Sequence, residues 1–318
     1  MVENLKEKSI GVLMGGISAE REVSLKSGKA VSNALTSLGY RVKEIDMTLE
    51  SLNELFTAEI DAAFIALHGR FGEDGTIQGM LELLRLPYTG SSHTSSAVAM
   101  NKLTAKQVLS YNGVQVTPFE TFTMSAYIER GYEHLRGELP LVIKPINEGS
   151  SVGISIVKEE ANLKHALDTA FAYDDTILVE KYIKGREIQV GILNNKALGV
   201  IEIVPKNEFY DFNAKYSDGG AEHIFPADLD DDANELVMAL GLKAHLALGC
   251  SGATRADFLL DDENEFYLLE VNTLPGMTEV SLLPEIAAGV GITFPELCEE
   301  ILKEAKLHVK STVKAGFH

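Results

Sequence analysis

The 318-residue chain is poor in several features, and each shortage excludes a class of protein. It has only two cysteines, Cys250 and Cys298, so we expect neither a disulfide framework nor a cysteine-ligated metal, and a reducing cytoplasm is the simplest location. No apolar run approaches the ~20 residues of a membrane span, and the charged start is not typical of a signal peptide. With 28 Lys and Arg against 47 Asp and Glu, the net charge of -19 argues against a nucleic-acid partner.

Two common nucleotide-binding motifs are also missing. Gly15-Gly16 follows an apolar run, but the spacing G-x-G-x-x-G is absent, so a nicotinamide or flavin site is not predicted. The Walker pattern G-x-x-x-x-G-K-[ST] is absent as well. A nucleotide is still possible, because one phosphate site needs only a few lysines and backbone amides.

Hydrophobic periodicity predicts an α/β fold. Strand-like runs at 9–14, 41–46 and 61–67 alternate with helical patterns at 24–38 and 76–85. This alternation predicts a parallel sheet, which binds ligands beyond the carboxyl ends of its strands. Further along, the pattern predicts helices at 95–111, 162–172, 230–249 and 294–306, and strands at 139–144, 154–157, 177–183 and 188–193.

The most informative polar residues stand two apart inside two apolar segments. Arg255 and Asp257 share one face of a predicted strand, and Glu270 and Asn272 share one face of the next. The acidic turn between the segments predicts a β-hairpin, and pairing of Asp257 with Glu270 would bring all four polar groups together. Three oxygen ligands beside one guanidinium suit magnesium or manganese, not zinc. The alternative is the solvated face of a half-exposed hairpin.

Lysine and glycine residues elsewhere predict phosphate and base contacts. Lys144 precedes the Gly/Ser-rich turn 147–153, whose amides can fold over phosphates like a lid; the alternative is an ordinary mobile hairpin loop. The strand edge that carries Glu180 and Lys181 suits adenine. The long polar segment 207–224 is expected to be functional or mobile.

Two residues follow predicted strand ends in the first hundred residues. Glu20 begins the helix after Gly15-Gly16, where it would receive an ammonium group or orient a hydroxyl. Its alternative role is to complement the helix dipole. His68 lies at the next strand end, and its alternative role is to satisfy a loop carbonyl.

Together these residues resemble the D-alanine–D-alanine ligases of the ATP-grasp superfamily, from about residue 9 to residue 307. One specific motif is HGRFGEDGTIQG at 68–79. The other joins Arg255-Ala256-Asp257 to LEVNTLPGMT at 269–278. Supporting matches lie at 15–24, 144–153, 214–216 and 281–282.

The resemblance implies an ATP-dependent carbon–nitrogen ligase. ATP would phosphorylate the carboxylate of one D-alanine, and the amine of a second would displace phosphate, giving D-alanyl-D-alanine for peptidoglycan synthesis. The implied cofactors are ATP and two Mg²⁺ or Mn²⁺ ions, and the implied protein is a cytoplasmic homodimer with no nucleic-acid or membrane partner. Alternatives are ligation to D-lactate or D-serine, and an inactive nucleotide-binding regulator.

The resemblance also implies a role for each site residue. The metal ligands would be Asp257, Glu270 and Asn272, and the catalytic residues would be Glu20, Ser150, Lys215, Tyr216, Arg255 and Gly276. Substrate would be bound by Glu20, His68, Arg255, Gly276, Ser281 and Leu282. ATP would be bound by Lys102, Lys144, Ser150, Ser151, Glu180, Lys181, Ile183, Glu187 and Lys215.

The implied fold is an ATP-grasp fold with an N-terminal parallel-sheet domain, a small central lid domain and a C-terminal antiparallel-sheet domain. Its expected domains are 1–98 for substrate binding, 99–183 for the phosphate lid, 184–308 for the metal and catalytic site, and a tail at 309–318.

Overall fold

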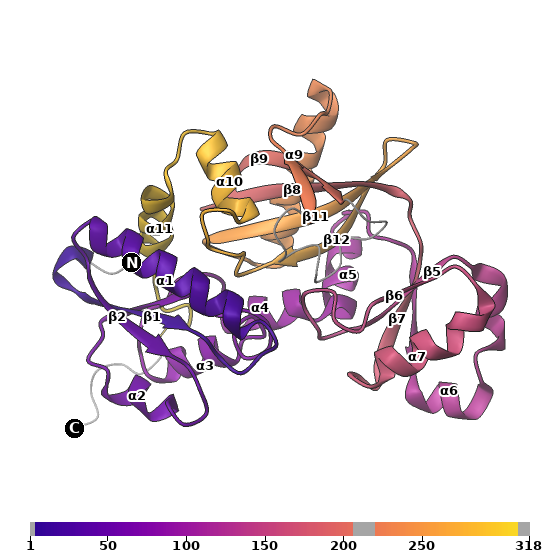
Figure 1. Cartoon of the computed structure of the whole chain (residues 1–318), viewed down its shortest axis with the longest axis horizontal. Helices are drawn as coiled ribbons and strands as arrows, with labels where there is room; N and C mark the ends of the chain where they lie inside the picture. Colours follow the sequence, from indigo (N-terminus) through magenta and orange to yellow (C-terminus); the bar gives the residue numbers. More distant parts are fainter. Residues whose placement is uncertain (1–3, 206–219, 311–318) are drawn as a thin grey trace.

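Three sheets follow one another along the chain in the computed structural model, which describes residues 4–205 and 220–310 (Figure 1). The first is parallel, with order β2-β1-β3; the second and third are antiparallel, with orders β4-β7-β5-β6 and β10-β9-β8-β11-β12. The expected architecture is therefore confirmed, whereas the domain boundaries at 98, 183 and 308 stay a prediction. No helix in the described residues is long and apolar enough to cross a membrane.

The elements of the first sheet follow the predicted order, with one short helix, α2, that was not predicted. They are β1 (Ser9–Met14), α1 (Arg21–Ser37), β2 (Arg41–Asp46), α2 (Leu52–Thr57), β3 (Ala62–Ile65) and α3 (Thr76–Leu83), after a short 3-10 turn at Leu5–Glu7. Strands β1 and β3 are apolar and almost wholly buried because helices cover the sheet, whereas the edge strand β2 is charged and mostly exposed.

The second and third sheets hold the remaining elements. Helices α4 (His93–Met100) and α5 (Lys102–Tyr111) lead to β4 (Phe119–Thr123), α6 (Met124–Arg130), β5 (Leu141–Pro145), β6 (Ser155–Val157), α7 (Leu163–Phe171) and β7 (Thr176–Lys181), with 3-10 turns at Glu133–Glu138 and Glu160–Asn162. The third sheet and its helices are β8 (Gly185–Leu193), β9 (Lys196–Pro205), β10 (Ala221–Ile224), α9 (Asp231–Ala247), β11 (Ala253–Asp261), β12 (Phe266–Asn272), α10 (Leu282–Gly289) and α11 (Phe294–Lys303).

The prediction of one helix over 95–111 is wrong, because the helix is interrupted at Asn101. The backbone of Asn101 is extended, with ψ at 101°, and its side chain accepts a hydrogen bond from the Thr104 amide at 2.9 Å. Asparagine is a strong helix N-cap, so a new helix begins at Lys102. The Lys102 amide donates to the Ile146 carbonyl at 2.8 Å, which fastens the start of α5 to the Gly/Ser-rich turn.

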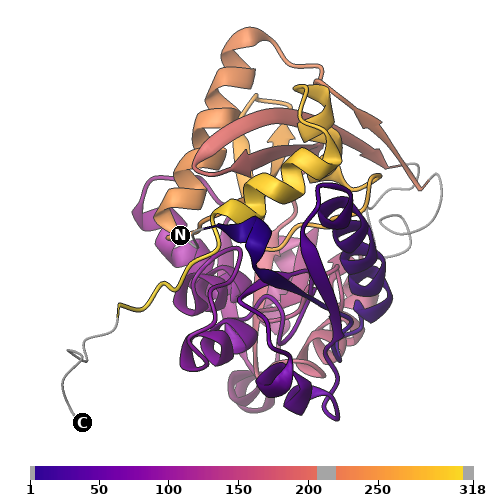
Figure 2. The same ribbon diagram turned by 90° about the vertical axis from the view of Figure 1, so that its left-hand side faces the viewer.

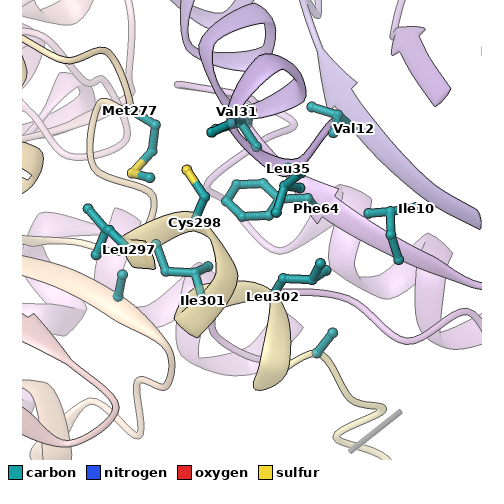
Figure 3. Packing of buried hydrophobic residues seen from close by; sticks show 14 of the residues in the cluster. Ile10, Val12, Val31, Leu35, Phe64, Met277, Leu297, Cys298, Ile301 and Leu302 are labelled. Carbon is teal, nitrogen blue, oxygen red and sulfur yellow. The ribbon is translucent and has the colours of Figure 1, made fainter. Parts of the chain in front are cut away.

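Helix α11 returns to the first sheet and completes its core. Leu297, Cys298, Ile301 and Leu302 pack with side chains of α1, β1 and β3, as Figure 3 shows; these partners are Val31, Leu35, Ile10, Val12 and Phe64. Figure 2 shows α10 and α11 between the first and third sheets. Met277 belongs to the same cluster, so burial of apolar surface holds the segment after β12 over the first sheet.

A buried histidine holds the start of β11. His245 of α9 is fully buried; its Nδ1 lies 2.7 Å from Thr254 Oγ1 and its Nε2 lies 3.0 Å from Asn195 Oδ1. Burial lowers the pKa of His245 to about 4. Thr254 directly precedes Arg255, so the ring supports the strand that carries the polar cluster.

We expect the free energy of unfolding to fall by roughly 2–3 kcal/mol between pH 6.5 and pH 4 because of His245. Below its ordinary pKa of 6.5 the unfolded chain gains a proton on this ring, while the folded chain stays neutral until about pH 4, so acid favours unfolding. Denaturant unfolding at pH 7 and pH 4.5 measures the change. His245→Gln should show a smaller fall than the unmodified protein, and equal falls would contradict this assignment.

Candidate active site

The β11–β12 hairpin brings four polar side chains to one place. In its register Arg255 lies opposite Asn272 and Asp257 lies opposite Glu270, as the spacing predicts. The register shifts just after Asp257, and the pairing then continues with Phe258 opposite Leu268. One face of this hairpin therefore carries two carboxylates, one carboxamide and one guanidinium.

Each carboxylate of the hairpin has a cationic partner. Arg255 donates from Nε to Asp257 Oδ1 at 2.7 Å and from Nη2 to Oδ2 at 2.8 Å. Asn272 Nδ2 donates to the same Oδ2 at 2.9 Å, and Lys102 Nζ lies 3.5 Å from Glu270 Oε2. Because the amide nitrogen of Asn272 contacts Asp257, its amide oxygen is the atom that a cation would take.

The donor set fits a hard divalent cation. Among residues 4–205 and 220–310, no group of three or more His, Cys, Asp and Glu side chains could hold a metal ion. A site on this hairpin would therefore use two carboxylates and one amide oxygen and leave positions for other oxygen ligands. Magnesium sites of this kind are usually completed by water and by a substrate's phosphates.

The Gly/Ser-rich turn after β5 lies against the first sheet. Ser150 and Ser151 have left-handed backbones, with φ of 45° and 62°, which bend the turn sharply. The Ser150 hydroxyl donates to Glu20 Oε1, at the N-terminus of α1. This contact joins residues 130 positions apart and closes the turn over the carboxyl edge of the parallel strands.

A second contact holds the same turn from the other side. Arg70 Nε lies 2.7 Å from Glu148 Oε1, and Arg70 Nη2 lies 3.8 Å from Asp174 Oδ1. Asp174 also accepts a hydrogen bond from the Asn147 amide at 2.9 Å. Arg70 and Glu148 were not predicted as site residues, although both lie in the motifs at 68–79 and 144–153.

His68 lies buried between α1 and the segment after β12. Its Nε2 lies 3.1 Å from Ser27 Oγ and its Nδ1 lies 3.1 Å from the Leu274 carbonyl, so it does satisfy a loop carbonyl. Glu73 Oε1 is 3.7 Å from Nδ1. Burial alone would lower the pKa of His68, but the carboxylates of Glu73 and Glu20 outweigh it and raise the pKa.

The segment after β12 presents a helix N-terminus beside this cluster. Ser281 is the N-cap of α10, and Leu282 is its first residue. Ser281 Oγ accepts from the Thr278 amide at 3.1 Å. Gly276 approaches Ser281 so closely that an added Cβ would lie 2.9 Å from Ser281 Oγ. Backbone amides in the first turn of a helix have no partner within the helix and favour a carboxylate.

Buried charges line the second sheet next to the Gly/Ser-rich turn. Lys144 Nζ lies 2.8 Å from Glu180 Oε1, and both side chains are buried. Burial raises the pKa of Glu180, but Lys144 and Lys106 more than compensate and lower it. Lys102 donates to the Glu148 carbonyl at 2.5 Å, so α5 links this sheet to the hairpin.

The remaining predicted residues are placed less centrally. Lys181 is the last residue of β7 and is exposed, although the four residues before it are buried. Ile183 and Glu187 are half-buried after it, and Ser151 lies half-buried in the turn. Lys215 and Tyr216 lie outside the residues that the structure describes.

Two further buried residues beside Glu180 were not predicted from the sequence. Lys106 and Thr117 both contact Glu180. Lys106 stands one helical turn after Lys102, and this i, i+4 spacing on one helix face was the available signal. This spacing indicates a binding role only when the helix is known to face a carboxylate.

Comparison with known proteins identifies the family. Residues 108–303 match the family model described as D-ala D-ala ligase C-terminus, and residues 49–91 match D-ala D-ala ligase N-terminus. A D-alanine–D-alanine ligase of Trichlorobacter lovleyi is 56% identical over 306 residues, which are 96% of this chain and 97% of that protein.

Two solved structures are similar across nearly the whole chain. The D-alanine–D-alanine ligase of Bacillus anthracis complexed with ATP is 35% identical with a TM-score of 0.81, covering 93% of this chain and 96% of its own. The VanG D-Ala:D-Ser ligase of Enterococcus faecalis is 30% identical with a TM-score of 0.82, covering 93% and 98%. By sequence and by fold, this chain belongs to the D-alanine–D-alanine ligase family.

Proposed function

We propose that the chain joins two D-alanine molecules to D-alanyl-D-alanine, with ATP converted to ADP and phosphate. One observation supports this most directly: Lys102 contacts both the carbonyl of Glu148 in the Gly/Ser-rich turn and the carboxylate of Glu270 on the hairpin. The turn and the hairpin therefore face one space. A phosphate-binding turn opposite two carboxylates is the arrangement that a metal-bound nucleotide requires.

The reaction needs an activated carboxylate, because oxide and hydroxide are poor leaving groups. Phosphoryl transfer from ATP gives a D-alanyl phosphate, and the amine of the second D-alanine displaces phosphate from it. In the first step Lys144 and the backbone amides of the turn neutralise the phosphoryl oxygens. Lys215 would add a further positive charge.

Divalent cations complete the nucleotide site in this proposal. Asp257, Glu270 and Asn272 would hold two Mg²⁺ or Mn²⁺ ions, whose positive charge would help to neutralise the phosphates of ATP. The protein's own share of this work is to hold the three oxygen ligands on one face. The strand pairing of Asp257 with Glu270 does so before any ligand arrives.

The second step builds a tetrahedral oxyanion on the activated carbonyl. Arg255 and a backbone amide near Gly276 are the groups that would stabilise it. Arg255 already lies in a fixed orientation, since both of its nitrogens that face Asp257 are hydrogen-bonded. A donor that is oriented in advance loses little freedom when charge develops.

The substrate groups match the charges around the site. The ammonium of the first D-alanine would bind Glu20, with His68 nearby. The carboxylate of the second would bind Ser281 and the Leu282 amide at the start of α10. The Ser150–Glu20 contact would become a triad with Tyr216 and exclude water, which would otherwise hydrolyse the acyl phosphate.

The base and ribose of ATP would lie along the second sheet. Lys102, Glu180, Lys181, Ile183 and Glu187 would line their pocket, and Ser151 would contribute to the phosphate turn. These assignments accord with the burial of Lys144 and Glu180 beside the turn.

A phosphate-release assay tests the proposal. The protein, ATP, Mg²⁺ and D-alanine should yield phosphate and D-alanyl-D-alanine in equal amounts, with the dipeptide measured by mass spectrometry. Folded protein that releases neither would refute the proposal. Tight ATP binding without turnover on any D-amino acid would indicate an inactive regulator instead.

The acceptor is the finer question. We propose D-alanine rather than D-serine or D-lactate, because D-alanine–D-alanine ligases of several bacteria are 46–56% identical to this chain over nearly its whole length. Competition between the three acceptors from pH 6 to pH 9 distinguishes them. An amine acceptor should gain over D-lactate as the pH rises and the amine loses its proton, and a preference for D-lactate throughout would contradict D-alanine.

We also propose that the protein is a homodimer in the cytoplasm, as the family resemblance implies. Its two cysteines, Cys250 and Cys298, are buried and free, which accords with a reducing compartment. Light scattering on the purified protein measures the assembly, and a monomer mass at micromolar concentration would contradict it.

A further inference from the structure

Lys106 of α5 is buried beside the proposed nucleotide site. Only 1% of its surface is exposed, and its ammonium lies 5.6 Å from the centre of the Phe119 ring on β4. Figure 1 shows α5 between the second and third sheets, and Lys106 faces the second. A buried lysine is uncommon unless its charge is paired.

Lys106 belongs to a chain of polar contacts that ends at Lys144. Its Nζ donates to Thr117 Oγ1 at 2.6 Å and lies 3.1 Å from Glu180 Oε1. The Thr117 hydroxyl, with its lone pair so engaged, donates to Glu180 Oε2 at 2.6 Å. Glu180 Oε1 in turn lies 2.8 Å from Lys144 Nζ. Both oxygens of Glu180 are therefore held, which fixes the carboxylate that orients Lys144.

The charges in this set of polar contacts, among the described residues, do not balance. Two buried ammonium groups share one buried carboxylate, and the next charge along α5, on Lys102, is also positive. Burying an ammonium costs free energy, and even a well-paired ion pair often stabilises a fold no better than apolar residues would. A second lysine on Glu180 is therefore poorly explained by folding alone. It is well explained by a ligand that brings several negative charges.

We propose that Lys106 is a positioning residue for ATP: through Thr117 and Glu180 it fixes Lys144, and its charge favours binding of the polyphosphate. The inference rests on the proposed use of ATP. It adds to the nucleotide site a residue that lies behind it and does not touch the phosphates.

The same geometry makes ATP binding depend on pH. Among the described residues, the charged groups that face Lys106 are Glu180 on β7, Lys144 on β5 and Lys102 on its own helix, and its neutral neighbours include Thr117 and Phe119. Burial lowers the pKa of Lys106 to about 8, while Glu180 partly opposes this. ATP should hold the proton on Lys106, so affinity should be full below pH 8 and fall as the pH rises above it.

The test measures the Kd of a non-hydrolysable ATP analogue with Mg²⁺ by calorimetry at pH 7 and pH 9. For the unmodified protein we expect Kd to rise by up to about tenfold between pH 7 and pH 9, because Lys106, with a pKa of about 8, loses its proton over this range. Lys106→Met keeps the length of the side chain and removes the charge. Its Kd should be at least about tenfold higher at pH 7 and should then change little with pH. In turnover, KM for ATP should rise more than kcat falls.

Lys164→Met is the matched control, because it removes the same charge from an exposed site on α7, which packs against the second sheet. It should follow the unmodified protein at both pH values. A Kd for Lys106→Met within twofold of the unmodified protein overturns the proposal. So does a lower melting temperature with unchanged Kd, which would mark Lys106 as structural.

Thr117→Val provides a second test if Lys106→Met does not fold. It removes the hydroxyl that links Lys106 to Glu180 and keeps both ammonium groups, so the Kd of the ATP analogue should rise by a few-fold. An unchanged Kd overturns the proposal. The binding measurements do not depend on dipeptide formation. An unmodified protein that binds the analogue but makes no dipeptide would therefore refute the proposed function and leave this inference standing.

Discussion

Glu270→Gln should reduce dipeptide formation by a factor of about 10²–10³ or more in kcat, the typical effect of losing one preorganised charge-stabilising group. Glu270 is one of two carboxylates on the hairpin, and Gln keeps its size while removing its charge. A divalent cation would then lose a ligand, and Lys102, 3.5 Å from Glu270 Oε2, would lose its anionic partner. The phosphates of ATP would meet a less neutralised site at the moment of transfer.

Two measurements separate this loss from unfolding. Binding of Mn²⁺, followed by electron paramagnetic resonance, should weaken, while the melting temperature should stay near that of the unmodified protein because Glu270 is only half-buried. Glu263→Gln removes the same charge from the exposed turn of the same hairpin and should retain full activity. Near-normal turnover of Glu270→Gln would show that this carboxylate holds no essential cation.

Arg255→Met should lower kcat by about 10²–10³-fold while changing the KM for D-alanine much less. The oxyanion exists only after the second amine attacks, so a donor aimed at it contributes little to ground-state binding. The guanidinium of Arg255 is held by Asp257 through two hydrogen bonds, at 2.7 and 2.8 Å. Methionine fills similar space and provides no donor.

The controls for Arg255 lie on the same sheet. Arg186 makes a similar two-point pair with Glu202, at 2.7 and 2.6 Å, on β8 and β9. Arg186→Met should lose a little stability and keep its kcat, which separates the loss of a partly exposed ion pair from the loss of an oxyanion donor. Arg255→Lys keeps the positive charge but loses the planar pair of donors, so its kcat should lie between those of Arg186→Met and Arg255→Met. Equal falls in kcat for Arg186→Met and Arg255→Met would point to a structural role.

The closed arrangement of the Gly/Ser-rich turn follows from side chains in separate parts of the chain. Ser150 meets Glu20, and Arg70 meets Glu148, so the first sheet supplies a carboxylate and a guanidinium to the same turn. The ion pair is partly exposed, and such pairs contribute at most about 1 kcal/mol. This ion pair therefore contributes little to the attachment of the turn.

Local pattern by itself determined the elements and the hairpin. Alternation of period two places Arg255 with Asp257 and Glu270 with Asn272, and a short acidic turn leaves little freedom in how the two strands pair. Helical periodicity likewise predicted α1, α7 and α9 to within a few residues. The break at Asn101 was not predicted, because the apolar pattern continues across it and only the cap reveals it.

Only the tertiary structure decided which distant groups meet. Contacts such as Lys106 with Glu180, Ser150 with Glu20 and the packing of α11 on α1 depend on how three sheets are placed relative to one another. That placement comes from burial of apolar surface, which has no direction and leaves no local signature in the sequence. The sequence therefore determined the chemistry that each strand and turn carries, and the packing of the sheets decided which of those groups share a site.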